Sequence, residues 1–143
     1  MPGFYTDVDA QRSGAADYRS TTRDVRRLID RLKADKVDGI VMDLRDNGGG
    51  HLSEATGLVG LFIEQGPVVQ LRETGGRTEV LDDPEPGVAW DGPLVVLVNR
   101  LSASASEIFA GAIQDYGRGL IVGSQTFGKG TVQALTPLNH GQL

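Results

Sequence analysis

The run Leu94-Val-Val-Leu-Val98 constrains the fold of this chain most strongly. An unbroken aliphatic run of this length, rich in β-branched residues, favours a strand buried inside a sheet. A second buried strand is predicted at Gly39–Leu44. Ala105–Tyr116 has apolar residues at the three- and four-residue spacing of an amphipathic helix. Strands that alternate with helices predict an α/β layered fold.

The remaining elements follow from the same patterns. Residues 6–19 are polar and show no clear periodicity. The other predicted elements are a helix that begins at Thr21 or Thr22 and stops at Asp38-Gly39, a helix over Leu52–Phe62 ended by Gly66-Pro67, hairpin strands Val68–Arg72 and Arg77–Leu81, and strands Leu120–Val122 and Thr131–Leu135.

The length and composition of the chain limit its number of domains and exclude several kinds of partner and site. A chain of 143 residues is long enough for one domain with a sizeable core. Its net charge of −5 argues against a nucleic-acid or anionic-membrane partner. The absence of cysteine excludes disulfides and thiolate metal sites. No apolar run is long enough to span a bilayer.

The stretch Ser102-Ala-Ser104-Ala-Ser106-Glu107 and the later Lys129 carry the chemistry. A serine hydroxyl is a poor nucleophile until a base takes its proton. The chain has two histidines, and a lysine that burial keeps neutral is the alternative base. Serine with lysine indicates acyl transfer. By chemistry alone, all three serines are candidates.

Ser104 also has a structural interpretation, because Ser104-Ala-Ser-Glu107 fits a capping box in which the serine only caps a helix. The two roles are compatible. A serine at a helix N-terminus lies beside free backbone N–H groups, including that of Ala105, which can stabilise an oxyanion. Gly48-Gly49-Gly50 follows a buried strand and indicates a close backbone approach, for which an oxyanion donor is one use.

Other interpretations are weaker. Gly123–Gly130 nearly matches a phosphate-binding loop after a strand, with Asp43 as a metal-binding strand end, but Gly130 replaces the hydroxyl that must hold magnesium. His51 and Glu54 are spaced like metal ligands, yet two ligands do not make a site, so we predict no metal. His51 remains an alternative base to Lys129.

Five ordered motifs resemble those of the tail-specific proteases, also called C-terminal processing serine peptidases, most closely the bacterial periplasmic branch. The resemblance runs from about Gly3 to the end of the chain. It implies a crotonase-like α/β core with a mixed sheet and flanking helices. The motifs are Asp43–Gly50, Gly92–Val98, Ser102–Phe109, Gln114–Gly117 and Phe127–Gln133.

The resemblance also implies roles for individual residues. The spacing between the family's serine and lysine selects Ser104 as nucleophile and Lys129 as general base. Gln133 matches a glutamine that orients the lysine, and Asp115 matches an aspartate with a structural or orienting role. The N–H groups of Ala105 and Gly50 would form the oxyanion hole.

By this resemblance the chain is a serine endopeptidase core that cleaves proteins near their C-terminal ends, on substrates with apolar C-termini, in the periplasm and without a cofactor. Residues 1–143 are expected to form a truncated core that lacks the family's PDZ domain and some flanking strands. The rival hypothesis is a non-catalytic module of the same fold that binds apolar ligands or peptides, as the interphotoreceptor retinoid-binding proteins do.

Overall fold

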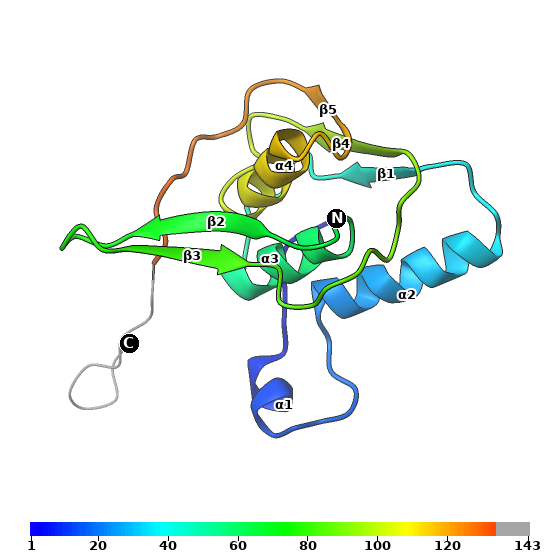
Figure 1. Cartoon of the computed structure of the whole chain (residues 1–143), viewed down its shortest axis with the longest axis horizontal. Helices are drawn as coiled ribbons and strands as arrows, with labels where there is room; N and C mark the ends of the chain where they lie inside the picture. The colour runs from blue at the N-terminus through cyan, green and yellow to red at the C-terminus, as the bar shows by residue number, and fades with distance from the viewer. Residues whose placement is uncertain (134–143) are drawn as a thin grey trace.

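A computed structural model describes residues 1–133, and Figure 1 shows how its helices and strands are arranged. Within these residues no helix is both long enough and apolar enough to cross a membrane. The elements are α1 (Val8–Arg12), α2 (Thr21–Ala34), β1 (Ile40–Asp43), α3 (Leu52–Gly60), β2 (Pro67–Arg72), β3 (Thr78–Asp82), β4 (Leu94–Val98), α4 (Ala105–Asp115) and β5 (Leu120–Gly123).

The central sheet is parallel, with β4 between β1 and β5. The strands β2 and β3 form a separate antiparallel hairpin. The helix α3 contacts α2 and α4, and α4 contacts β5 and β2 (Figure 1). Phe62 and Phe109 meet edge to face in the core, with ring centroids 5.8 Å apart. The predicted α/β layered fold is therefore confirmed, with its parallel and antiparallel strands in two sheets.

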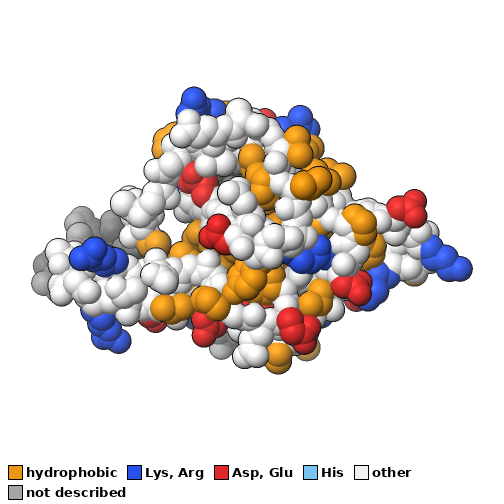
Figure 2. Space-filling model, turned by 45° about the horizontal axis from the view of Figure 1, so that its top comes forward, with side chains coloured by type: hydrophobic (Ala, Val, Ile, Leu, Met, Phe, Trp, Pro, Cys, Tyr) orange, Lys and Arg blue, Asp and Glu red, His pale blue; other side chains and the backbone are white. Residues whose placement is uncertain are grey.

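Only one face of the parallel sheet is covered by the described residues. Along β4, Leu94, Val96 and Val98 are buried, and the side chains between them are partly exposed. On the neighbouring strands Val41 is 63% exposed and Leu120 is 67% exposed. The prediction that the first strand is buried throughout is therefore wrong for one face. Figure 2 shows hydrophobic side chains that reach the surface in patches among the charged ones.

Several boundaries differ from the prediction. The polar stretch 6–19 contains the short helix α1, which Asp7 caps by accepting a hydrogen bond from the Ala10 N–H. The helix α3 ends at Gly60, well before the predicted stop at Gly66-Pro67. Residues 131–133 form no strand, and the rest of the predicted strand Thr131–Leu135 lies outside the described residues.

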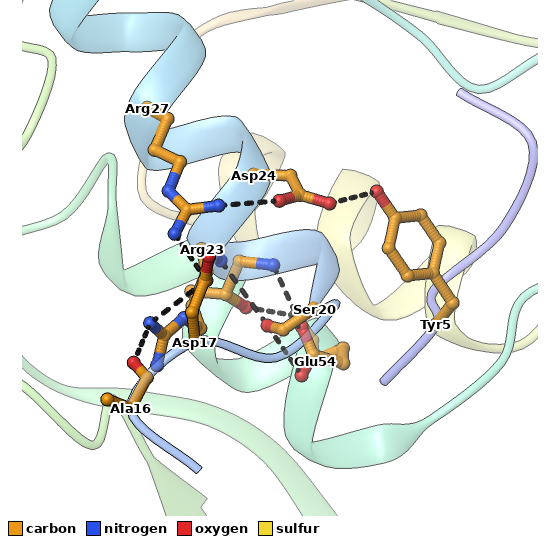
Figure 3. Close-up of polar contacts among 9 residues, drawn as sticks. Tyr5, Ala16, Asp17, Ser20, Arg23, Asp24, Arg27 and Glu54 are labelled. Atoms are coloured by element: carbon orange, nitrogen blue, oxygen red, sulfur yellow. Dashed lines mark hydrogen bonds and ion pairs between the residues drawn. The ribbon is translucent and has the colours of Figure 1, made fainter. Parts of the chain in front are cut away.

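A buried carboxylate joins α3 to the start of α2, as Figure 3 shows. Glu54 lies in the first turn of α3 and is 5% exposed. It accepts hydrogen bonds from the Ser20 hydroxyl at 2.8 and 3.0 Å and from the Thr22 N–H at 2.8 Å. Ser20, rather than Thr21 or Thr22, is the N-cap of α2. Glu54 thereby satisfies free donors at this helix start.

We expect Glu54→Gln to lower the free energy of unfolding by about 1–3 kcal/mol, because its amide sets a donor against the groups that now donate to the carboxylate. Urea unfolding would measure the change. Glu73→Gln is the matched control, because Glu73 is exposed on the hairpin. Equal stability of the two variants would contradict the role assigned to Glu54.

Candidate active site

The parallel pairing of β1 with β4 sets the position of the candidate site. The glycine triplet follows β1, and the serine-rich turn follows β4, so both leave neighbouring strands at the same edge of the sheet. A cavity of about 370 Å³ lies between these segments and the later Lys129. Its lining residues are Gly48, Gly50, His51, Leu52, Ser104, Ala105, Ile108, Lys129, Thr131, Val132 and Gln133.

Ser104 stands at the N-cap of α4 with an unusual backbone conformation, φ 57° and ψ −117°. A positive φ is unfavourable for a residue with a side chain, and such strain is concentrated at functional sites. The Glu107 half of the predicted capping box is present, since the Ser104 N–H donates to Glu107 Oε2 at 2.8 Å. Ser104 therefore caps α4 and also faces the cavity.

The two neighbouring serines are fully buried and hold the turn in place. The Ser102 hydroxyl donates to the carbonyl of Leu44 at 2.7 Å. The Ser106 hydroxyl donates to the carbonyl of Asn47 at 2.9 Å. Both bonds join the turn after β4 to the segment after β1. Of the three candidate serines, only Ser104 lines the cavity.

Asn47 locks the glycine triplet, a role that the sequence pattern did not reveal. Its side chain is fully buried and accepts a hydrogen bond from the Gly49 N–H at 2.9 Å. The Asn47 carbonyl also accepts from the Ala103 N–H at 3.0 Å. A Cβ at Gly49 would lie 2.7–2.9 Å from atoms of Ala103, Ser104 and Ala105, so the loop packs directly on the serine turn.

Two of the cavity-wall N–H groups without a partner among residues 1–133 belong to the predicted oxyanion donors. The N–H groups of Gly50 and Ala105 donate to no other group among residues 1–133. The Gly49 N–H, in contrast, is engaged by Asn47. Two unpartnered donors on either side of a serine are what an oxyanion requires. Gly50 and Ala105, the predicted donors, both line the cavity with Ser104.

Lys129 lies on an irregular segment that follows β5 and turns back past α4 (Figure 1). The Phe127 N–H donates to the Ser102 carbonyl at 3.0 Å, which ties this segment to the serine turn. Lys129 and Gln133 both line the cavity with Ser104. The expected burial of Lys129 is absent, because the residue is exposed. The apolar side chains that were expected to bury it are exposed too, Phe127 to 61% and Val132 to 57%. The segment pairs with no strand in the described part of the chain, so nothing there covers it.

Glu107 has more contacts at this site than a helix cap needs. Its Oε1 accepts from the Gly128 N–H at 2.6 Å, and its Oε2 accepts from the Lys129 N–H at 2.9 Å. Although burial alone would raise the pKa of Glu107, hydrogen bonds from Gly128, Thr126, Ser104 and Lys129 hold it below its ordinary value. Sequence analysis identified Glu107 only as a capping residue, because its loop partners are far away in the chain.

Asp115 lies apart from this cavity. It is the last residue of α4 and lines a different cavity beside β2, with Tyr116 and Pro67–Gln70. Among the predicted site residues it is the one that the fold does not bring to Ser104.

The discarded interpretations can be compared with the geometry. His51 lines the cavity, but its neighbour Glu54 is committed to the start of α2. The Asp43 carboxylate accepts from Arg45 at 2.7 and 2.9 Å, and its pKa is lowered to about 2 mainly by these side-chain bonds. Across residues 1–133, no three acidic or histidine side chains gather as a metal site would require.

The chain is similar in sequence to known proteins. The chain is 52% identical over 122 residues to the tail-specific protease of Haemophilus influenzae, covering 85% of this chain and 18% of that protein. It is 39% identical to the chloroplastic carboxyl-terminal-processing peptidase 2 of Arabidopsis thaliana, covering 82% of this chain and 23% of that protein. The chain thus spans about a fifth of the length of these relatives.

A solved structure also resembles this fold. The photosystem II D1 C-terminal processing protease matches with a TM-score of 0.75 and 37% identity, over 85% of this chain and 31% of that one. The model of peptidase family S41 matches residues 5–143. With nearly the whole chain matched, this protein belongs to peptidase family S41.

Proposed function

We propose that this chain is the catalytic core of a serine endopeptidase that uses Ser104 and Lys129 to cleave proteins near their C-terminal ends. One observation carries the proposal. A single cavity is lined by Ser104, Lys129 and Gln133, together with Gly50 and Ala105, whose N–H groups donate to nothing in the described part of the chain. These are the parts that acyl transfer needs: a nucleophile, a base and oxyanion donors.

In the proposed reaction, the Ser104 oxygen attacks the scissile carbonyl carbon while the Lys129 amine, in its uncharged form, takes the hydroxyl proton. The carbonyl oxygen becomes an oxyanion, which accepts hydrogen bonds from the Gly50 and Ala105 N–H groups. The carbon–nitrogen bond then breaks, and the lysine returns the proton to the leaving amine. Water releases the acyl group from Ser104 by the same steps.

Two further residues have supporting roles in this proposal. Gln133 lines the cavity with Lys129, a position from which its amide would orient the lysine amine. Asp115 has a structural or orienting role, which its place at the far end of α4 requires it to exert through the helix. No cofactor is part of the proposed mechanism.

The substrate proposal rests on the lining of the cavity and on the relatives. Leu52, Ile108 and Val132 give the cavity apolar walls beside Ser104, which suits a substrate with an apolar C-terminus. A relative that is 52% identical is named a tail-specific protease. We also propose a periplasmic location, because the sequence most resembles the bacterial periplasmic branch.

We expect a fluorophosphonate probe to label Ser104 in the full-length product that contains this chain. Ser104→Ala should abolish labelling, and Lys129→Ala should slow it by about a thousandfold, because the serine then lacks its base. Mass spectrometry of the labelled peptide would identify the residue. A folded wild-type protein that stays unlabelled would contradict the proposal and favour the binding module.

The identity of the base has its own control. Lys129→Arg should not restore labelling, since a guanidinium group does not deprotonate in this range. His51→Ala should change the labelling rate little. If Lys129→Arg labels normally and His51→Ala does not, histidine is the base and the lysine mechanism is wrong.

We expect Gly49→Ala to slow labelling by about a hundredfold, because small displacements of reacting groups are costly. A Cβ there would meet backbone atoms of the serine turn within 3 Å, at a φ of +101°. Gly48→Ala is the matched comparison, since a Cβ at Gly48 meets nothing within 4 Å. Equal labelling rates for the two variants would show that the packing of Gly49 on the turn is unimportant.

A further inference from the structure

We propose that Glu107 is a positioning residue whose carboxylate holds the lysine-bearing segment in register with the Ser104 turn. The inference rests on the proposed function, because it concerns how that site is aligned. Glu107 would not touch the substrate. It would act through the backbone of Ser104 and the backbone of Lys129.

The contacts of the carboxylate carry the inference. One oxygen, Oε2, accepts from the Ser104 N–H at 2.8 Å and from the Lys129 N–H at 2.9 Å. The other, Oε1, accepts from the Gly128 N–H at 2.6 Å. A single side chain therefore bonds the backbones of the proposed nucleophile and the proposed base. Hydrogen bonds to an ionised acceptor are shorter and stronger than those between neutral groups.

Little else in the described structure holds the lysine segment. Residues 124–133 form no helix or strand, and Lys129 itself is exposed. Besides Glu107, two contacts tie the segment to the serine turn. They are the Phe127 N–H to the Ser102 carbonyl at 3.0 Å and Arg100 to Gln125 at 3.3 Å. Because neither lies at Lys129, the position of the lysine depends mainly on Glu107.

A simple capping role does not account for these contacts. In a capping box, the Glu107 side chain makes only one of the two reciprocal bonds, the one to the Ser104 N–H. The bonds to Gly128 and Lys129 add nothing to the helix end. They come from a segment more than twenty positions away in the chain, and they place that segment at the cavity.

Glu107→Gln is the sharpest test, since it keeps the shape of the side chain but replaces one acceptor oxygen with a donor. We expect the rate constant for fluorophosphonate labelling of Ser104 to fall about ten- to a hundredfold. In ¹⁵N NMR spectra, the Gly128 and Lys129 amide resonances should shift together. Glu79→Gln is the matched control, because Glu79 is exposed on β3, and it should leave both readouts unchanged.

A double variant separates positioning of the lysine from a purely structural effect. Because Glu107 acts partly through Lys129, adding Glu107→Gln to Lys129→Ala should lower the residual labelling rate by a smaller factor than it lowers the wild-type rate. An undiminished effect in that background, or wild-type labelling by Glu107→Gln, would overturn the inference. If Glu107→Gln does not fold, Glu107→Asp replaces it, because the shorter side chain keeps the charge but cannot reach the Ser104, Gly128 and Lys129 N–H groups together. That variant should show a smaller fall in rate, and an unchanged rate would overturn the inference.

The failure of this inference differs from failure of the proposed function. A wild-type protein that is not labelled at Ser104 contradicts the proposed function and, with it, the positioning role. A labelled wild-type protein whose Glu107→Gln variant labels equally fast contradicts the positioning role alone.

Discussion

The parallel pairing of β1 with β4 is the contact on which the candidate site depends. Register pairs Asp43 with Leu97, so the two strands end together and their following loops start side by side. Buried hydrogen bonds then connect those two loops. The Asn47 carbonyl accepts from Ala103 and Ser106, and Ser102 donates to Leu44. Because these groups are shielded from water, each unmade bond would cost about 1–3 kcal/mol, which keeps the loops in one arrangement.

These hydrogen bonds explain how an unfavourable backbone conformation persists next to the cavity. Ser104 has a φ of 57°, which is unfavourable for a residue with a side chain. Gly49 has a φ of 101°, which glycine adopts readily because it has no Cβ. Strain of this kind costs about 1–3 kcal/mol and survives only where the surroundings over-determine it. Here the surroundings are the start of α4 and the Asn47 network. The strained residue is also the one serine of its turn that faces the cavity.

The lysine side of the site is built differently. The serine turn and the glycine loop are held by the sheet and by buried side chains, whereas the segment with Lys129 lies exposed over them. This segment is attached mainly by hydrogen bonds to the Glu107 carboxylate, in the first turn of α4, and by the bond from the Phe127 N–H to the Ser102 carbonyl. Regions with few buried contacts open most easily. The site thus combines a rigid half, which holds the proposed nucleophile Ser104, with a lightly held half, which holds the proposed base Lys129.

The sequence alone predicted most of the elements and suggested the chemistry that we propose. Hydrophobic periodicity predicted the three strands of the parallel sheet, the hairpin and the three longer helices, because these patterns depend on neighbouring residues. Motif resemblance selected Ser104, Lys129, Gln133, Gly50 and Ala105. Boundaries were less predictable: α3 ends early and α1 was missed, since caps such as Asp7 act through geometry rather than periodicity.

Tertiary structure alone decided which groups meet. The partners of Asn47 and Glu107 lie on segments distant in sequence, so no local pattern reveals their hydrogen bonds. It also decided that the Gly49 N–H is engaged while the Gly50 N–H has no partner within residues 1–133, a choice that three identical residues cannot encode locally. Among residues 1–133, packing leaves one face of the parallel sheet open and Lys129 exposed, although both were predicted to be buried. Residue type sets what a group can do, but burial and hydrogen-bond partners come from segments that only folding brings together.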